Sequence, residues 1–289
     1  MYTIENEELK VDISPKGAEL QGVFNKQTQL EYLWDGNPAF WSKRSPILFP
    51  IVGSLKGNIY YYHNRHYALN RHGFARDMVF EVLPQQKNSI SFLLKNDETT
   101  LQYYPFEFEL KITYTIQQNS LRVSYNVKNV SGHEMFFSIG GHPAFKLPLL
   151  AGTVYEDYYL EFNEEETKPR WPISKDGLIG TCPVPLLQET NILHLSKELF
   201  SEDAIVLKNL ASSIVSVKTG KSKHGLDVDF GDFPYLGIWA AKNADFVCIE
   251  PWCGIADGVH ASQQLADKEG INRLNSGDSF IRSWIGTFY

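Results

Sequence analysis

The chain has 289 residues, of which 27 are Lys or Arg and 34 are Asp or Glu, so its formal net charge is −7. This acidic balance argues against a nucleic-acid-binding surface and favours a soluble protein. The length allows one large domain or two small ones, and it is sufficient for a hydrophobic core without disulfide or metal support.

Cysteine usage and the first residues of the chain bear on its location. Its three cysteines, Cys182, Cys248 and Cys253, form no CxxC pair, and an odd number favours a reducing compartment over a disulfide framework. The opening stretch MYTIENEELK lacks the basic start and the apolar run of a signal peptide. No apolar run approaches the roughly 20 residues of a membrane helix. We therefore expect a cytoplasmic protein without membrane association.

Alternation of apolar and polar residues dominates the chain, and the aromatic content is high, which together favour strands. In chain order, this pattern predicts strands at 9–13, 59–62, 78–83, 89–94, 106–114, 121–127, 134–139, 213–217, 225–230, 235–239 and 278–285. The turn residues Gln118 and Asn119 join 106–114 and 121–127 into a long antiparallel hairpin with one buried face. Helical signals are few: a short helix near 196–202 and another at 259–268, with Gly270 as its C-terminal cap.

The order of these elements predicts an all-β fold. No strand–helix–strand alternation is present, which argues against a parallel, doubly wound sheet. The chain has no linker-like segment and no repeat, so residues 1–289 are expected to form a single domain, a large sandwich of antiparallel sheets with few short helices. The three glutamates at 164–166 are expected to lie in a solvated loop. A concave sheet face in such a fold could hold a small polar ligand.

Motifs for cofactors and metals are missing or incomplete. The chain has no dinucleotide fingerprint, no HExxH and no GxSxG. Residues 219–222 (TGKS) resemble the end of a phosphate-binding loop, but Val215 stands where its first glycine belongs. Asp227 and Asp229 alternate with apolar residues, as expected for the solvated face of a strand rather than for a calcium loop. We expect neither a cofactor nor a metal.

Three titratable residues stand in unusual surroundings. His142 lies in GGHPAF, where the glycines permit a close approach of a ligand to the backbone and the proline fixes the chain direction. It could equally be a structural histidine in a turn. Glu250 ends an apolar strand beside Trp252, which should raise its pKa towards the range of a base, unless an unseen cation pairs with it. His72 is flanked by Arg71 and Arg76 and could be a simple surface histidine. The remaining six histidines have polar neighbours and are expected to face solvent.

Six segments in order give these residues a context: GAEL (17–20), PILFPIVG (46–53), HGFAR (72–76), GHPAF (141–145), PYLGIW (234–239) and CIEPW (248–252). With them the chain resembles the aldose 1-epimerase (galactose mutarotase-like) family, specifically its LacX-like branch, along almost its whole length. The resemblance implies a β-supersandwich fold. It also implies an isomerase that interconverts the α and β anomers of a sugar without a cofactor.

The resemblance implies roles for four residues. His142 corresponds to the general acid that protonates the sugar ring oxygen, and Glu250 to the general base that removes the proton of the anomeric hydroxyl. His72 corresponds to a second histidine that hydrogen-bonds the sugar. Asp203 resembles the family aspartate that holds ring hydroxyls.

One position departs from the family pattern. Many relatives carry a sugar-binding arginine just after the glycine of PIVG, where this chain has Ser54. Arg44 or Arg76 could supply a cation instead, or each could be a surface charge. The small Ser54 side chain could also leave room for a larger sugar.

The expected substrate is a neutral hexose such as galactose or glucose. A hexose 6-phosphate is the alternative, because Lys43 with Arg44, or Arg71 with Arg76, could bind a phosphate. Two other function classes stay open: a non-catalytic carbohydrate-binding module of the same fold, and an enzyme that cleaves glycosidic bonds with a pair of carboxylates. The sequence gives no indication of the oligomeric state.

Overall fold

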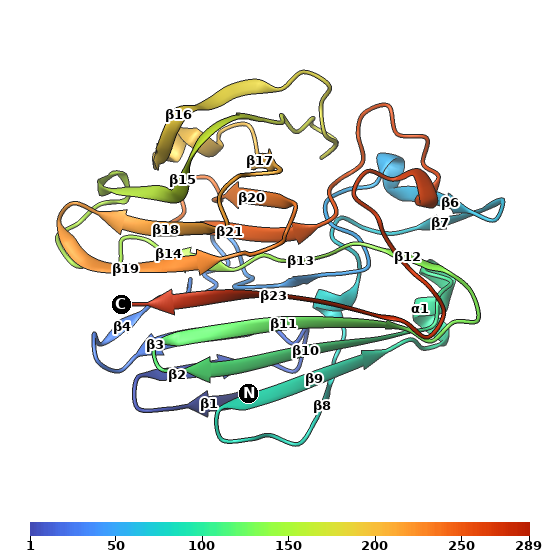
Figure 1. The fold of residues 1–289 in the computed structure, drawn as a ribbon, viewed down its shortest axis with the longest axis horizontal. Helices are drawn as coiled ribbons and strands as arrows, with labels where there is room; N and C mark the ends of the chain where they lie inside the picture. Colours follow the sequence, from blue (N-terminus) through green and yellow to red (C-terminus); the bar gives the residue numbers. More distant parts are fainter.

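The computed structural model of the protein describes residues 1–289, and almost all of its regular structure is antiparallel β-sheet (Figure 1). The largest sheet has nine strands, in the spatial order β16 (Val184–His194), β15 (Tyr158–Arg170), β18 (Ile214–Thr219), β19 (Ser222–Asp229), β23 (Ser279–Phe288), β11 (Ser120–Asn129), β10 (Phe108–Gln117), β9 (Ser89–Lys95) and β8 (Glu81–Val82). The all-β fold expected from the sequence is confirmed.

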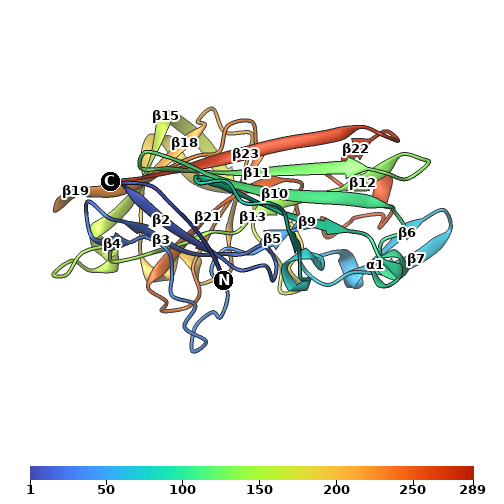
Figure 2. The same cartoon turned by 90° about the horizontal axis from the view of Figure 1, so that it is seen from below.

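A second sheet supplies most of the other layer. It runs in the order β17 (Ile205–Lys208), β20 (Tyr235–Trp239), β21 (Phe246–Cys253), β13 (Ile139–Gly141) and β5 (Ile47–Leu48), and β14 (Ala144–Lys146) also pairs with β21. Figure 2 shows β23, β11, β10 and β9 side by side, with β21, β13 and β5 in a layer beneath them. The apolar side chains between these layers belong to a continuous core of 69 buried residues.

Smaller elements complete the fold. A four-stranded sheet contains β1 (Tyr2–Glu5), β2 (Leu9–Ile13), β3 (Leu20–Asn25) and β4 (Leu30–Glu31), and two further pairs are β6 (Ile59–Tyr62) with β7 (Arg65–Ala68) and β12 (Met135–Phe137) with β22 (Asn272–Leu274). The α-helix is α1 (Glu98–Tyr103), and the 3₁₀ turns are η1 (Lys56–Asn58), η2 (Ala75–Asp77), η3 (Tyr155–Asp157), η4 (Lys197–Phe200) and η5 (Leu265–Asp267). No helix is long and apolar enough to cross a membrane.

The predicted hairpin supplies two long, adjacent strands of the nine-stranded sheet. Strands β10 and β11 pair along their full lengths, from Phe108 opposite Asn129 to Gln117 opposite Ser120. Burial alternates along β10, so one face packs on the core, as the alternation predicts. The predicted strands at 9–13, 59–62, 89–94 and 235–239 also lie where expected, whereas 78–83 contributes only the two residues of β8.

Two local predictions are wrong. Residues 259–268 form no α-helix beyond the short turn η5, because Gln263 has a left-handed backbone (φ +64°) and the Lys268 side chain turns inward to a buried pair with Asp257. The glutamates at 164–166 lie in β15 rather than in a loop. Glu166 is buried there, and its carboxylate accepts a hydrogen bond from the Ser212 backbone N–H.

Candidate active site

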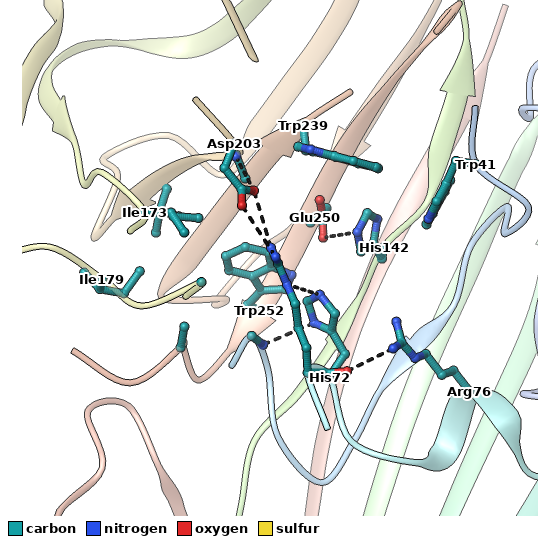
Figure 3. Close-up of a pocket in the computed structure, with 16 residues that line it drawn as sticks. Trp41, His72, Arg76, His142, Ile173, Ile179, Asp203, Trp239, Glu250 and Trp252 are labelled. Atoms are coloured by element: carbon teal, nitrogen blue, oxygen red, sulfur yellow. Dashed lines mark hydrogen bonds and ion pairs between the residues drawn. The ribbon is translucent and has the colours of Figure 1, made fainter. Parts of the chain in front are cut away.

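Sheet register brings His142 and Glu250 together. Strands β13 and β14 are two short pieces that both pair with β21, and His142 and Pro143 form the break between them. Gly140 lies opposite Trp252 and Ala144 lies opposite Cys248, so the same register sets His142 opposite Glu250. Nε2 of His142 is 3.3 Å from Oε2 of Glu250, and the two side chains point toward each other (Figure 3).

The glycines before His142 serve packing. A Cβ on Gly140 would lie 2.6 Å from Cδ1 of Trp252, and one on Gly141 would lie 2.5 Å from the Tyr125 hydroxyl. Both glycines therefore allow close contact between β13 and its neighbours. This corrects the interpretation that they admit a ligand to the backbone. The His142 backbone is fixed independently, because its N–H donates to the Pro46 carbonyl.

These residues open on a cavity of about 360 Å³, within the usual range for a small-molecule site. Its sixteen lining residues are Trp41, Gly53, Arg71, His72, Arg76, His142, Ile173, Gly177, Ile179, Asp203, Ala204, Val206, Trp239, Glu250, Trp252 and Ala256. Five of the six residues expected at a site, His72, Arg76, His142, Asp203 and Glu250, are thus gathered around one pocket. They come from separate parts of the chain, and the fold brings them together (Figure 3).

Arg44 is the exception. It does not line the pocket, because its guanidinium turns away and donates to the Gln21 carbonyl. Its main chain still supports the site, since the Arg44 carbonyl accepts the N–H of Ala144 in β14. Ser54 does not line the pocket either: it is buried, and Gly177 lies directly against its hydroxyl. The hypothesis that a small residue at 54 enlarges the binding space therefore has no support from its position.

Burial sets the protonation of the central pair. Glu250 is 1% exposed, and burial raises the pKa of its carboxyl well above the ordinary value, although the nearby Arg71 cation opposes this shift. Burial, assisted by Arg71, lowers the pKa of His142 to about 3. Both groups therefore favour their neutral forms. A neutral carboxyl carries its titratable proton and a neutral imidazole has lost one, so the pair holds a single titratable proton, on Glu250.

Several polar atoms of the pocket residues have no partner within the protein. Oε2 of Glu250, Nδ1 of His142 and Nε1 of Trp252 are all buried, and none makes a hydrogen bond. The 3.3 Å contact between Glu250 and His142 lacks hydrogen-bond geometry. Unsatisfied buried polar groups typically cost about 1–3 kcal/mol each. Three such atoms around one cavity mark a site suited to a polar ligand.

Aromatic rings hold the His142 imidazole in place. The Trp41 indole lies against it with ring centroids 4.8 Å apart and the planes tilted by 30°. Trp239 meets the same imidazole edge-on at 5.5 Å. Sequence reasoning missed Trp41, which lies in a segment without a recognisable motif. Trp239 and Trp252 were visible as parts of PYLGIW and CIEPW, but no role was predicted for either.

Two pocket residues have an unusual backbone. His72 (φ +70°) and Asp203 (φ +93°) are both left-handed without being glycine, which is strained and is often found at functional sites. His72 exchanges backbone hydrogen bonds with the PIVG segment: its N–H donates to the Gly53 carbonyl, and the Gly53 N–H donates to its Nδ1. This contact joins two of the sequence segments noted above.

Arg71 is the charged pocket residue for which no individual role was predicted. Its Nη atoms lie 3.4 and 3.5 Å from the two carboxylate oxygens of Asp203. Arg76 lies beside it and donates to the Arg71 carbonyl. The flanking of His72 by two arginines was the available signal, but the sequence could not show that both line the same cavity as Asp203.

One group of side chains has the composition of a metal site. The potential ligand atoms of His142, Cys248 and Glu250 all lie within 4.8 Å of one another. Burial raises the pKa of the Cys248 thiol well above its usual value, which disfavours the thiolate that metals bind. Cys248 also lies outside the pocket lining. The donor set therefore suits a resident metal poorly.

Comparison with known proteins connects this geometry to a family. The family model described as aldose 1-epimerase matches residues 1–264. The chromosomal protein LacX of Lactococcus lactis subsp. lactis is 36% identical over 291 residues, which cover 97% of each chain.

Two solved structures show the same fold. A galactose mutarotase related enzyme from Lactobacillus acidophilus is 40% identical and superimposes with a TM-score of 0.95, covering 100% of this chain and 97% of the other. A galactose mutarotase-like protein from Lactobacillus casei is 31% identical, with a TM-score of 0.94 and complete coverage of both chains. The galactose mutarotase-like β-supersandwich expected from the sequence is thereby confirmed.

Proposed function

This chain belongs to the aldose 1-epimerase family of isomerases, and we propose that it interconverts the α and β anomers of a free, neutral aldose. The single observation that carries the proposal is the pair formed by Glu250 and His142. A buried carboxyl and a buried imidazole face each other at 3.3 Å in a pocket of small-molecule size. Anomer exchange requires one group that takes a proton while another gives one.

The reaction begins with a shift of the shared proton. Glu250 must act as a carboxylate and His142 as an imidazolium, so the proton of the pair has to reside on His142 when the sugar reacts. The carboxylate then removes the proton of the anomeric hydroxyl, while the imidazolium donates its proton to the ring oxygen. The bond between C1 and the ring oxygen breaks, and the sugar becomes an open-chain aldehyde.

The burial of the pair favours this open stage. After ring opening Glu250 is protonated and His142 is neutral, which are the forms that burial stabilises. Rotation about the C1–C2 bond presents the other face of the aldehyde. Ring closure then runs the same proton transfers in reverse and restores the starting state of the pair. The overall reaction consumes nothing, so the chemistry needs no cofactor or energy source.

Charge in the pocket favours a neutral sugar over a hexose 6-phosphate. Arg71 and Arg76 both line the cavity, as a phosphate site would require. Each has an acidic neighbour, however: Asp203 lies 3.4 Å from Arg71, and Asp77 lies 3.7 Å from Arg76. Asp203 would also repel a phosphate placed beside Arg71. A glycosidase would need Asp203 as a second free carboxylate, and the contact with Arg71 disfavours that role.

The proposal is tested by the rate of anomer exchange, followed by polarimetry or NMR with glucose, galactose, xylose and glucose 6-phosphate. Replacement of either member of the pair, Glu250→Gln or His142→Asn, should slow the exchange by about 10²- to 10⁴-fold, the usual contribution of one acid or base. Glu166→Gln is the matched control, because Glu166 is also 1% exposed but lies outside the pocket.

Two outcomes would contradict the proposal. Full activity in Glu250→Gln would remove the base from the mechanism. If the wild-type protein binds sugars but accelerates none of them, it is a carbohydrate-binding module and not a mutarotase.

A further inference from the structure

The proposed reaction requires His142 in the form that its surroundings oppose. The imidazolium must donate a proton to the ring oxygen of the sugar, yet burial lowers the pKa of His142 to about 3. Some other group must therefore make the charged form accessible during turnover. The charged and titratable side chains around the imidazole are those of Glu250, Cys248, His72, Arg71 and Arg76.

These five neighbours do not solve the problem. The cations of Arg71 and Arg76 repel an imidazolium. His72 and Cys248 are neutral, because burial lowers the pKa of the first and raises the pKa of the second. Glu250 attracts the imidazolium only after it has become a carboxylate, which its own burial opposes. The remaining stabilisation has to come from a group that carries no charge.

The Trp41 indole is such a group. Its ring centroid lies 4.8 Å from that of the His142 imidazole and the planes are tilted by only 30°, so the two rings lie face to face (Figure 3). Trp239, by contrast, stands perpendicular to the imidazole, at 89°. The face of an aromatic ring is electron-rich and attracts a cation within about 6 Å, and tryptophan does so better than tyrosine or phenylalanine.

Other contacts hold the Trp41 indole in this orientation. The Phe246 ring packs on it with centroids 5.6 Å apart and planes tilted by 32°. The main chain of Trp41 is fixed on both sides, because its carbonyl accepts the Trp34 Nε1–H over 2.9 Å and its N–H donates to the Asn37 carbonyl. The indole face is therefore in place before a charge develops on the imidazole, and no rearrangement is needed when it does.

We propose that Trp41 is a positioning residue for the general acid, whose indole face stabilises the imidazolium form of His142 by a cation–π interaction. The inference rests on the proposed function, because the imidazolium is required for proton donation to a sugar. A group that favours the charged acid over the neutral one changes the rate of the chemical step and not the affinity for the sugar. Loss of the indole should therefore lower kcat by about 10- to 30-fold, the range for a partly desolvated cation–π contact, with KM nearly unchanged.

The test weakens the indole face without changing the shape of the side chain. Fluorine substituents withdraw electron density from the ring, so the protein is prepared with tryptophan, 5-fluorotryptophan or 5,7-difluorotryptophan, and kcat and KM of anomer exchange are measured. The value of kcat should fall stepwise with each fluorine, whereas KM should stay constant. The same amino acids in the Trp41→Phe protein leave position 41 unlabelled, and kcat of that variant should not depend on fluorination.

A titration of His142 gives a second readout that does not depend on turnover. The protonation of its imidazole is followed by NMR in the Arg71→Met protein, because Arg71 lowers the pKa of His142 and its removal moves the titration to milder pH. In this protein Trp41→Leu should weaken proton binding to His142 by the same factor of about 10 to 30. Phe40→Leu is the matched control, because Phe40 is an exposed neighbour in the same loop that does not line the pocket, and it should change neither readout.

Two results would overturn the inference in an active enzyme. If fluorination leaves kcat unchanged, Trp41 serves packing alone; if it changes KM alone, the indole contacts the sugar and not the imidazolium. Failure of the proposed function is a separate result, in which the wild-type protein accelerates the exchange of no sugar. The titration then still decides, since equal proton binding to His142 with Trp41 and with Leu at position 41 rejects the cation–π interaction.

Discussion

At the scale of single residues, one proton shared by two buried groups explains the chemistry. Glu250 and His142 shift in opposite directions for the same reason, because burial disfavours a charge on either of them. His72 lies in the same cavity but has a different task. Its Nδ1 accepts the Gly53 N–H, and the Arg71 Nε–H is directed at its Nε2 over 3.3 Å, so neighbouring donors fix its ring. Two neighbouring histidines thus differ through their backbone contacts.

The shared proton predicts an unusual pH profile. A second proton reaches the pair only near the lowered pKa of His142, about 3, and the last one leaves only above the raised pKa of Glu250. Log kcat/KM should therefore show no break at pH 4.5, the ordinary value for Glu, and should stay flat from there up to the raised pKa of Glu250. The measurement is the exchange rate against pH, corrected for spontaneous mutarotation. A break near pH 4.5 would contradict the shared-proton state, because it would show a Glu250 carboxyl with an ordinary pKa.

At the scale of elements, the broken strand formed by β13 and β14 carries the site. Both pieces keep the same register with β21, so the interruption frees His142 from the ladder without moving it away from Glu250. Close contact between β13 and β21 depends on Gly140, whose missing Cβ leaves space for the Trp252 indole. The position of the acid and the packing of a pocket wall are therefore coupled.

A methyl group at this contact tests the coupling. Gly140→Ala would bring Cβ to 2.6 Å from Trp252 Cδ1 and 3.0 Å from the Pro251 carbonyl oxygen. We expect a loss of about 1–3 kcal/mol in the free energy of unfolding, as for other overpacked sites, with a lower exchange rate. Gly132→Ala is the control, since nothing lies within 4 Å of its added carbon. Urea unfolding of both variants gives the comparison, and equal stability would reject the packing role.

Some elements could be predicted from the sequence and others could not, for physical reasons. The hairpin β10–β11 has a strict period of two because one face is buried, so the sequence shows it clearly. Three consecutive glutamates in β15 indicated a solvated loop, so this part of the strand was not predicted. Glu166 is nevertheless buried, because its carboxylate accepts the Ser212 N–H, a partner that only the folded chain provides. The sequence also contains the cap of α1, a reciprocal pair of Asp97 and Thr100, although no helix was predicted there.

The site was predictable to a similar extent. Family segments identified His142, Glu250 and His72, a separate short resemblance pointed to Asp203, and the fold places all four around one cavity. The choice among arginines could not be made from the sequence. It depends on side-chain direction: Arg44 turns to the Gln21 carbonyl, whereas Arg71 turns into the pocket beside Asp203.

At the scale of the whole molecule, the end of the chain holds the middle of the largest sheet. Strand β23 lies between β11 and β19 and pairs with both, and it thus joins the two halves of the nine-stranded sheet. One contact ties it to the four-stranded sheet, because Asn25 of β3 donates to the Phe288 carbonyl, and just beyond both elements Tyr32 donates to the carbonyl of Tyr289. The matched family segment ends at residue 264, before this strand begins.

Removal of residues 278–289 should therefore abolish folding and not merely lower activity. Both neighbours of β23 would lose their hydrogen-bond partner, and the buried side chains of Trp284 and Phe288 would leave the core. Removal of residues 1–5 should have a small effect, because β1 is an edge strand with mostly exposed side chains. Circular dichroism during heating distinguishes the two: a cooperative transition in the C-terminal truncation would show that the sheet closes without β23.

The contact between Gly177 and Ser54 has a consequence for how such proteins diverge. Any side chain at 177 would begin 2.6 Å from the Ser54 hydroxyl and 3.6 Å from the Arg71 guanidinium. A longer residue at 54 would collide with the turn that contains Gly177, whose φ of +76° is rarely adopted by residues other than glycine. Positions 54, 71 and 177 should therefore covary: homologues that carry their cation at 54 should have a displaced or longer turn and no arginine at 71.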